Sequence, residues 1–201
     1  MIGGMAGGMM VRVLFAAGAL MLTVGFWQAG SGVYIEAKAW LGQHLIRTAW
    51  AETLEGGARQ LPWFWADTWP VARLQVPRLN QDLIVLSGAS GRTLAWGPGH
   101  QDGSALPGRA GATVIAGHRD THMTFLRDMQ SGDEIRITDR HGATHRYRAL
   151  STQVVHKDLA RIVTDDGGHR LVLVTCWPFD SLTASGPFRF VVEAVRVDKP
   201  S

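Results

Sequence analysis

From Val71 onward the sequence consists of short β-type runs separated by glycine and asparagine turns, and this pattern limits the fold more than any other feature. Seven or more short strands within about 125 residues predict a mainly β protein, either a closed barrel or a sandwich. The turn DRHGATH predicts a hairpin, and HMTFLRDMQSG is long enough for a helix of about two turns. The seven runs are VARLQVPRL, DLIVLSG, GATVIAG, DEIRITD, THRYRALSTQVV, RLVLVTC and FRFVVEAVRV.

The composition fits one globular domain of ordinary size with an appendage. The 201 residues are 46% hydrophobic and 18% charged, which argues against a disordered or collagen-like chain. The net charge is only +3, and the basic residues are scattered singly among Asp and Glu. Because nucleic-acid binding requires clustered Lys and Arg, we expect no nucleic acid partner.

An uncharged apolar run lies near the N-terminus. It covers residues 13–29 and, continued through Ile35, is long enough at about 1.5 Å per helical residue to cross a hydrocarbon core of about 30 Å. We therefore expect a retained single-pass membrane anchor in contact with lipid, with Trp27 at the interface. The alternative is a cleaved secretory signal, since Arg12 precedes the run and small residues follow it at 29–31. Positive charges on both sides of the run leave its orientation open.

Two segments join this run to the β-rich part. Residues 36–57 repeat apolar side chains at helical spacing and predict a helical stalk that ends at Gly56 and Gly57. The aromatic link LPWFWADTWP follows, and we expect its rings to pack on the domain rather than contact a membrane. The predicted organisation is an anchor over 1–35, a helical stalk and aromatic linker over 36–69, and a β domain over 70–201.

Cys176 is the only cysteine in the chain, so it cannot close an intrachain disulfide. It ends the apolar run 171–174, which we expect to be buried on both faces, and Trp177 and Pro178 then stop the strand. A thiol placed there can be presented at a rim as a nucleophile. It can also be a buried apolar filler or half of an intermolecular bridge.

A thiol nucleophile needs a nearby imidazole or cation. His118 ends another apolar strand, ATVIAGH, and so occupies the same kind of strand-end position as Cys176, although it can also merely cap that strand. Arg189 lies in a third strand, PFRFVV, where alternation places it on the opposite face from the two flanking phenylalanines. Because an unpaired buried charge is costly, this arginine must be paired or reach solvent.

These three segments together resemble a known family. VIAGHRDTHMTFLRDMQSGDEI, LVLVTCWPFD and GPFRFVV resemble the sortases, cysteine transpeptidases marked by a histidine after a strand, a Thr-Cys dipeptide at a strand end and an arginine on the following strand. The resemblance begins near WPVARLQVPRL, continues through LAWGPGHQDGSALPGRAGATVIAGHRDT, and covers about 130 residues in the expected order. The TCWPFD and GPFRFVV contexts, with the apolar N-terminus, look most like the Gram-negative class.

The resemblance implies an eight-stranded β-barrel in which Cys176, His118 and Arg189 meet at one groove. It further implies that the Cys176 thiolate attacks a C-terminal LPXTG-like sorting motif of a secreted protein, giving a thioester, while His118 protonates the leaving amine. Arg189 would hold the substrate or the oxyanion, and an amine at the cell envelope would resolve the thioester. Thr175 and Trp177 are candidate substrate-binding residues. No cofactor is implied, and the catalytic domain is expected outside the cytoplasm, on the periplasmic face in a Gram-negative cell.

Three alternatives to this interpretation remain open. HRDTH places His118, Asp120 and His122 in a string that could ligate zinc, but no fourth ligand is evident nearby. The same thiol site would act as a cysteine peptidase if water replaced the amine. A membrane-tethered β-barrel without chemistry is the third alternative. We expect no metal site, since DMQSGDE is also short of a calcium ligand set.

Overall fold

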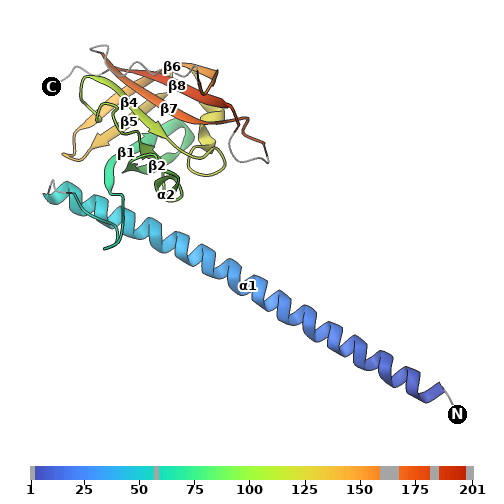
Figure 1. Cartoon of the computed structure of the whole chain (residues 1–201). Helices are drawn as coiled ribbons and strands as arrows, with labels where there is room; N and C mark the ends of the chain where they lie inside the picture. Colours follow the sequence, from blue (N-terminus) through green and yellow to red (C-terminus); the bar gives the residue numbers. More distant parts are fainter. Residues whose placement is uncertain (1–2, 57–58, 159–167, 182–185, 198–201) are drawn as a thin grey trace. The chain divides into compact units, whose positions relative to one another are not determined.

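The computed structural model describes residues 3–56, 59–158, 168–181 and 186–197. The chain divides into two compact units, residues 1–42 and 43–201. Helix α1 (Gly3–Gly56) runs without a break through the first unit and into the second, so the predicted anchor and stalk lie on one helix that ends where the sequence indicates. Figure 1 shows this helix and the β domain that follows it.

Within the described residues, eight strands close into a barrel in the order β1-β2-β3-β4-β7-β8-β6-β5 (Figure 1). Pairs β2/β3 and β4/β7 are parallel and the remaining neighbours are antiparallel. The predicted barrel is therefore confirmed, and the sandwich alternative is wrong. The strands are β1 (Pro70–Val76), β2 (Gln81–Ser87), β3 (Gly99–His100), β4 (Gly111–Ala116), β5 (Glu134–Asp139), β6 (Thr144–His156), β7 (His169–Trp177) and β8 (Phe188–Arg196).

In the described parts of the connections lie three short helices: η1 (Pro77–Leu79), α2 (Gly91–Leu94) and η2 (Thr124–Asp128). The sequence predicts about two helical turns around η2, but η2 is a 3₁₀ helix of five residues. It stops because Met129 adopts an extended conformation and the Gln130 N–H donates to the Asp133 carboxylate instead of a helical carbonyl. The predicted hairpin is confirmed, since β5 and β6 pair on either side of the turn after Asp139.

The barrel interior is filled by alternate residues of the strands, as expected from side chains that alternate across a sheet. Leu171 and Leu173 of β7 belong to this interior cluster, whereas Val172 belongs to a second cluster on the other face of the same sheet. Strand β7 is thus apolar on both faces. The expectation of burial over 171–174 is confirmed for 171–173, whereas Val174 is only half-buried. The interior cluster also contains Ala72, Leu74, Val76, Val85, Ile115, Met123, Phe125, Leu126, Met129, Ile135, Ile137, Tyr147, Ala149, Phe179, Val192 and Ala194.

The last turns of α1 pack on the barrel within the second unit. Ile46 and Trp50 form a buried cluster with Ile84 and Leu86 of β2. The Gln43 amide donates to the backbone carbonyl of Trp96 at 2.6 Å. These contacts make the C-terminal part of the predicted stalk an integral element of the β domain rather than a free spacer.

The aromatic link behaves in two ways. Trp63 packs against Trp96 with ring centroids 4.9 Å apart, and Trp69 is half-buried, as the sequence predicts. Phe64 and Trp65 instead contact each other edge to face and are 88% and 69% exposed. The expectation that the whole link packs on the domain is therefore wrong for these two rings.

In the first unit, many of the described apolar side chains of α1 are exposed. The helix is long and apolar enough over Leu14–Gly56 to cross a membrane, judged by length and composition, a test that a signal sequence also passes. The exposed apolar residues of this unit include Leu14, Phe15, Leu20, Met21, Leu22, Val24, Phe26, Trp27, Val33, Tyr34, Ile35, Trp40 and Leu41.

Candidate active site

Cys176 and Arg189 are cross-strand neighbours. Strands β7 and β8 are antiparallel, and their register pairs Cys176 directly with Arg189. Because directly opposed residues in a sheet project from the same face, the thiol and the guanidinium share one face of the barrel wall. Both side chains are half-buried, so each is partly accessible from solvent.

His118 lies on the other side of Cys176. Strand β4 pairs in parallel with β7 and ends with Ala116 opposite Val174. Beyond that pair, the Gly117 N–H donates to the Val174 carbonyl at 3.1 Å. Continuing this register by two residues places the exposed His118 beside Cys176. The neighbouring strands β4, β7 and β8 therefore bring the three predicted catalytic residues to one end of the barrel, with Cys176 in the middle.

Thr175 and Trp177 alternate with Cys176 and point to the other face. Thr175 is 2% exposed, and its hydroxyl donates to the Gly117 carbonyl at 2.8 Å. Trp177 is half-buried and packs against Phe179 and Phe190, with ring centroids 5.6 and 5.8 Å away. Thr175 is thus too buried to contact a ligand. Its hydrogen bond instead joins the segment that ends in Cys176 to Gly117, the residue before His118.

The Arg189 guanidinium is held by its own segment. Its Nη1 donates to the backbone carbonyls of Gly186 at 2.8 Å and Phe188 at 2.9 Å. In the described part of the chain it forms no ion pair with a carboxylate. Phe190, the next residue, belongs to the interior aromatic group, so the sequence-based expectation that Arg189 points away from it is confirmed.

Arg119 and His122, which follow His118 in the chain, also lie at this end of the barrel. The sequence did not indicate their structural roles. Arg119 is 6% exposed, and its Nη2 donates to the Ser181 carbonyl at 2.8 Å, tying the loop after β4 to the segment after Cys176. His122 is half-buried close to His118, and burial is the main cause that lowers its pKa below the usual value. A hydrogen bond to the Ala95 backbone opposes this shift and the charge of His118 adds to it, so His122 favours the neutral form.

The described residues contain no group of three or more His, Cys, Asp or Glu side chains arranged to hold a metal ion. His118, Asp120 and His122, the string that the sequence offered as zinc ligands, do not form such a group. The same end of the barrel offers a thiol, an imidazole and a guanidinium instead. That set is suited to covalent attack on a carbonyl, proton delivery to a leaving group and stabilisation of an oxyanion.

An eight-stranded barrel with these residues at the ends of β4 and β7 and the start of β8 defines the class. The chain belongs to the sortase family: the sortase domain matches residues 74–197, which is more than half of the chain.

Known proteins agree with this assignment. The chain is 32% identical over 125 residues to sortase D of Bacillus subtilis (strain 168), and the match covers 62% of this chain and 62% of that protein. Sortase A from Corynebacterium diphtheriae superposes with a TM-score of 0.60 at 31% identity, covering 67% of this chain and 64% of that one. Sortase C-1 from Actinomyces oris gives 0.58 at 27% identity, covering 65% and 74%. These matches do not support the narrower expectation of a Gram-negative class.

Proposed function

We propose that this protein is a cysteine transpeptidase that acts through Cys176. The observation that carries the proposal is the position of Cys176 in the barrel wall. It pairs across the sheet with Arg189, and on its other side β4 pairs with β7 up to Ala116 and Val174, two residues before His118 and Cys176. A free thiol that serves only as filler needs neither neighbour. A half-buried thiol beside an imidazole and a cation has the neighbours that nucleophilic cysteine chemistry uses.

The chemistry follows from these three groups. The Cys176 thiolate attacks a peptide carbonyl and forms a sulfur–carbon bond, while Arg189 stabilises the negative charge on the carbonyl oxygen. His118 gives its proton to the leaving amine as the carbon–nitrogen bond breaks, which leaves a thioester on Cys176. An incoming amine then attacks the thioester, loses a proton to His118 and releases the thiolate.

Several finer features belong to the same proposal. The substrate is a secreted protein with a C-terminal LPXTG-like sorting motif, and the acceptor is an amine at the cell envelope. The helix over Leu14–Gly56 supports a single-pass anchor in lipid, with the β domain outside the cytoplasm. The TCWPFD and GPFRFVV contexts support the Gram-negative class, in which that side is periplasmic. Thr175 acts by positioning Cys176 and His118, and Trp177 shapes the wall beneath the site.

Mass spectrometry of the full chain mixed with sorting-motif peptides and a small amine tests the proposal. We expect an acyl adduct on Cys176 and an amine-transfer product, both lost in Cys176→Ala. Peptide released as free acid despite abundant amine would instead identify a hydrolase. Unchanged peptide processing by Cys176→Ala would reject the covalent mechanism, and peptide binding without any product would identify a binding module.

A further inference from the structure

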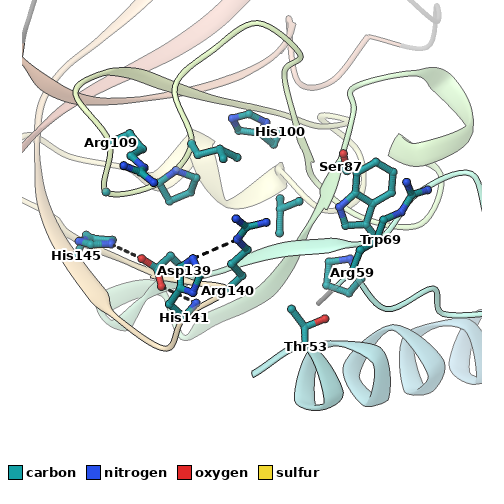
Figure 2. Close-up of a pocket in the computed structure, with 15 residues that line it drawn as sticks. Thr53, Arg59, Trp69, Ser87, His100, Arg109, Asp139, Arg140, His141 and His145 are labelled. Carbon is teal, nitrogen blue, oxygen red and sulfur yellow. Dashed lines mark hydrogen bonds and ion pairs between the residues drawn. The ribbon is translucent and has the colours of Figure 1, made fainter. Parts of the chain in front are cut away.

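A second concave site lies away from the thiol. A pocket of about 390 Å³ opens between the end of α1, the link that follows it, the loop before β4 and the β5–β6 hairpin (Figure 2). Its volume falls in the range of small-molecule sites, about 300–1,000 Å³. Gly108 and Arg109 line it and precede β4, whereas His118 and Cys176 lie beyond the other end of that strand. At about 3.3 Å per residue, β4 separates the two sites by about 20 Å.

Three of the side chains that line this pocket are arginines. Figure 2 shows Arg109, Arg140 and Arg59 on three sides of it. They come from three separate segments: the loop before β4, the β5–β6 turn, and the link after α1. Arg59 is oriented by Trp69, since its guanidinium carbon lies 3.4 Å from the centroid of that ring. Such stacking fixes the guanidinium plane while its N–H groups remain able to donate elsewhere.

Asp139 is the one carboxylate that lines the pocket, and its oxygens already have donors. One oxygen accepts from the backbone N–H groups of His141 at 2.9 Å and Ala143 at 3.1 Å. The other lies 2.9 Å from Nε2 of the buried His145 (Figure 2). The carboxylate is therefore committed to shaping the hairpin. Within the described residues, no carboxylate forms an ion pair with Arg59, Arg109 or Arg140.

The wall next to Arg109 is rigidly built. Gly108 has a φ of +83°, and a Cβ at this position would lie 2.3 Å from Nε2 of His145. The backbone before Arg109 therefore packs directly on the imidazole that Asp139 holds. A packed wall together with a rim of exposed guanidiniums is suited to a ligand that brings both organic surface and negative charge.

We infer that this pocket binds an organic phosphate, with Arg109 and Arg140 as its main donors and Arg59 closing the rim. Guanidinium forks match phosphate oxygens in pairs, and three guanidiniums without carboxylate partners leave positive charge that such an anion would neutralise. The pocket is larger than one phosphate group requires, so part of it accommodates the organic portion. The phosphate can belong to a phospholipid headgroup or to a soluble ester. This site is independent of the chemistry proposed for Cys176.

Calorimetric titration of the full chain in non-ionic detergent with glycerol 3-phosphate tests the inference. We expect saturable binding that Arg109→Gln and Arg140→Gln each weaken by about tenfold, since each removes a charge-assisted hydrogen-bonding group. Arg148→Gln is the matched control, because it removes an exposed arginine that does not line the pocket. Absence of binding, or an equal loss in Arg148→Gln, would overturn the inference.

Chemical modification of the unsubstituted chain provides a test that does not depend on folding of the variants. Phenylglyoxal labels accessible arginines, and glycerol 3-phosphate should protect Arg109 and Arg140 but not Arg148. Equal labelling with and without the ester would reject the site.

Nanodiscs distinguish the two sources of phosphate. If the headgroup is the ligand, discs containing phosphatidylglycerol should protect Arg109 and Arg140 without added ester, whereas phosphatidylcholine discs should not. If the ligand is soluble, protection should require the ester in both kinds of disc. Either pattern supports the pocket and identifies the source; protection in neither condition contradicts it.

Discussion

At the scale of single residues, the geometry separates the side chain that we propose as the nucleophile from the one that lies on the opposite face of its strand. Cys176 and Arg189 share a face by strict cross-strand pairing, while Thr175 turns inward and bonds to Gly117. The residues alone predict a nucleophile and a possible base, but they do not predict that these side chains meet. Their meeting depends on the β4–β7 and β7–β8 registers, which are set by tertiary packing, and only the resemblance to sortases indicated it.

Arg189→Lys tests whether the guanidinium fork is needed. Lysine keeps the charge but cannot donate two parallel hydrogen bonds, so we expect turnover to fall about 10²- to 10³-fold, as for loss of one oxyanion donor. Thermal stability should stay close to that of the unsubstituted chain, because Arg189 is half-buried and, within the described residues, donates to carbonyls of its own segment. Alkylation of Cys176 should persist. The control is Arg196→Lys at the far end of β8. Full turnover in Arg189→Lys would show that Arg189 does not belong to the catalytic site.

His122 is expected to make stability depend on pH. Its pKa is lowered mainly by burial, so the folded state favours the neutral ring and the unfolded chain binds the proton more readily. The contribution of His122 is therefore complete above about pH 6.5, the ordinary histidine pKa, and is lost as the pH falls through the lower folded value. Denaturant midpoints should fall less steeply below that pH in His122→Gln than in the unsubstituted chain. The exposed His141→Gln serves as the control, and an identical slope in all three proteins would contradict the assignment.

At the scale of elements, the sequence predicts the strands that form a run of several β-type residues and misses the strand that does not. All seven β-type runs correspond to strands, because each contains several β-forming residues bounded by turn residues. Strand β3 has two residues and no period to detect. Its existence depends on a close backbone approach, since a Cβ on Gly99 would lie 2.1 Å from the Gly88 carbonyl oxygen. The sequence does not predict the proposed phosphate pocket either, because its lining residues come from segments far apart in the chain.

An ion pair between η1 and the turn before β5 provides a test at this scale. Asp133 is buried and accepts from the Arg78 guanidinium, and the same carboxylate caps the Gln130 N–H at 2.7 Å. Asp133→Asn should lower the free energy of unfolding at neutral pH by about 1–3 kcal/mol, the usual cost of losing hydrogen bonds to a charged, buried group. Chemical denaturation measures this loss.

The neighbouring Glu134→Gln is the matched control for Asp133. Glu134 pairs with Arg136 and Arg146 at the surface, and these arginines lower its pKa to about 2. Exposed pairs contribute about 0–1 kcal/mol, so the control should lose less stability. The pKa of Asp133 is also lowered, chiefly by Arg78, so its contribution should be present above about pH 4 and lost as the pH falls further. If Glu134→Gln lost more stability than Asp133→Asn, the ion pair of Asp133 with Arg78 would not be what joins η1 to the turn before β5.

At the scale of the whole molecule, the sequence predicts the barrel and the apolar helix for different reasons. The barrel follows from many short strands that must bury a shared interior, and β7, apolar on both faces, lies within its wall. The helix follows from an uncharged run whose described apolar side chains are exposed in the first unit. Such a surface is stable only if something apolar covers it, and the proposed anchor assigns this cover to the hydrocarbon core of a membrane.

The membrane anchor can be tested by adding charge within the apolar run. The full chain should stay in the membrane fraction after high-salt and carbonate washing, with an intact mass that includes the N-terminal segment. Leu22→Arg combined with Val24→Arg should release most of the protein, because each arginine near the centre of a spanning helix costs about 2.5–3.5 kcal/mol of insertion free energy. Leu54→Arg, on an exposed position of the same helix within the second unit, should remain membrane-bound. Recovery of a shortened, soluble chain from unsubstituted protein would instead establish a cleaved signal, and the β domain would then reach its substrates without a tether.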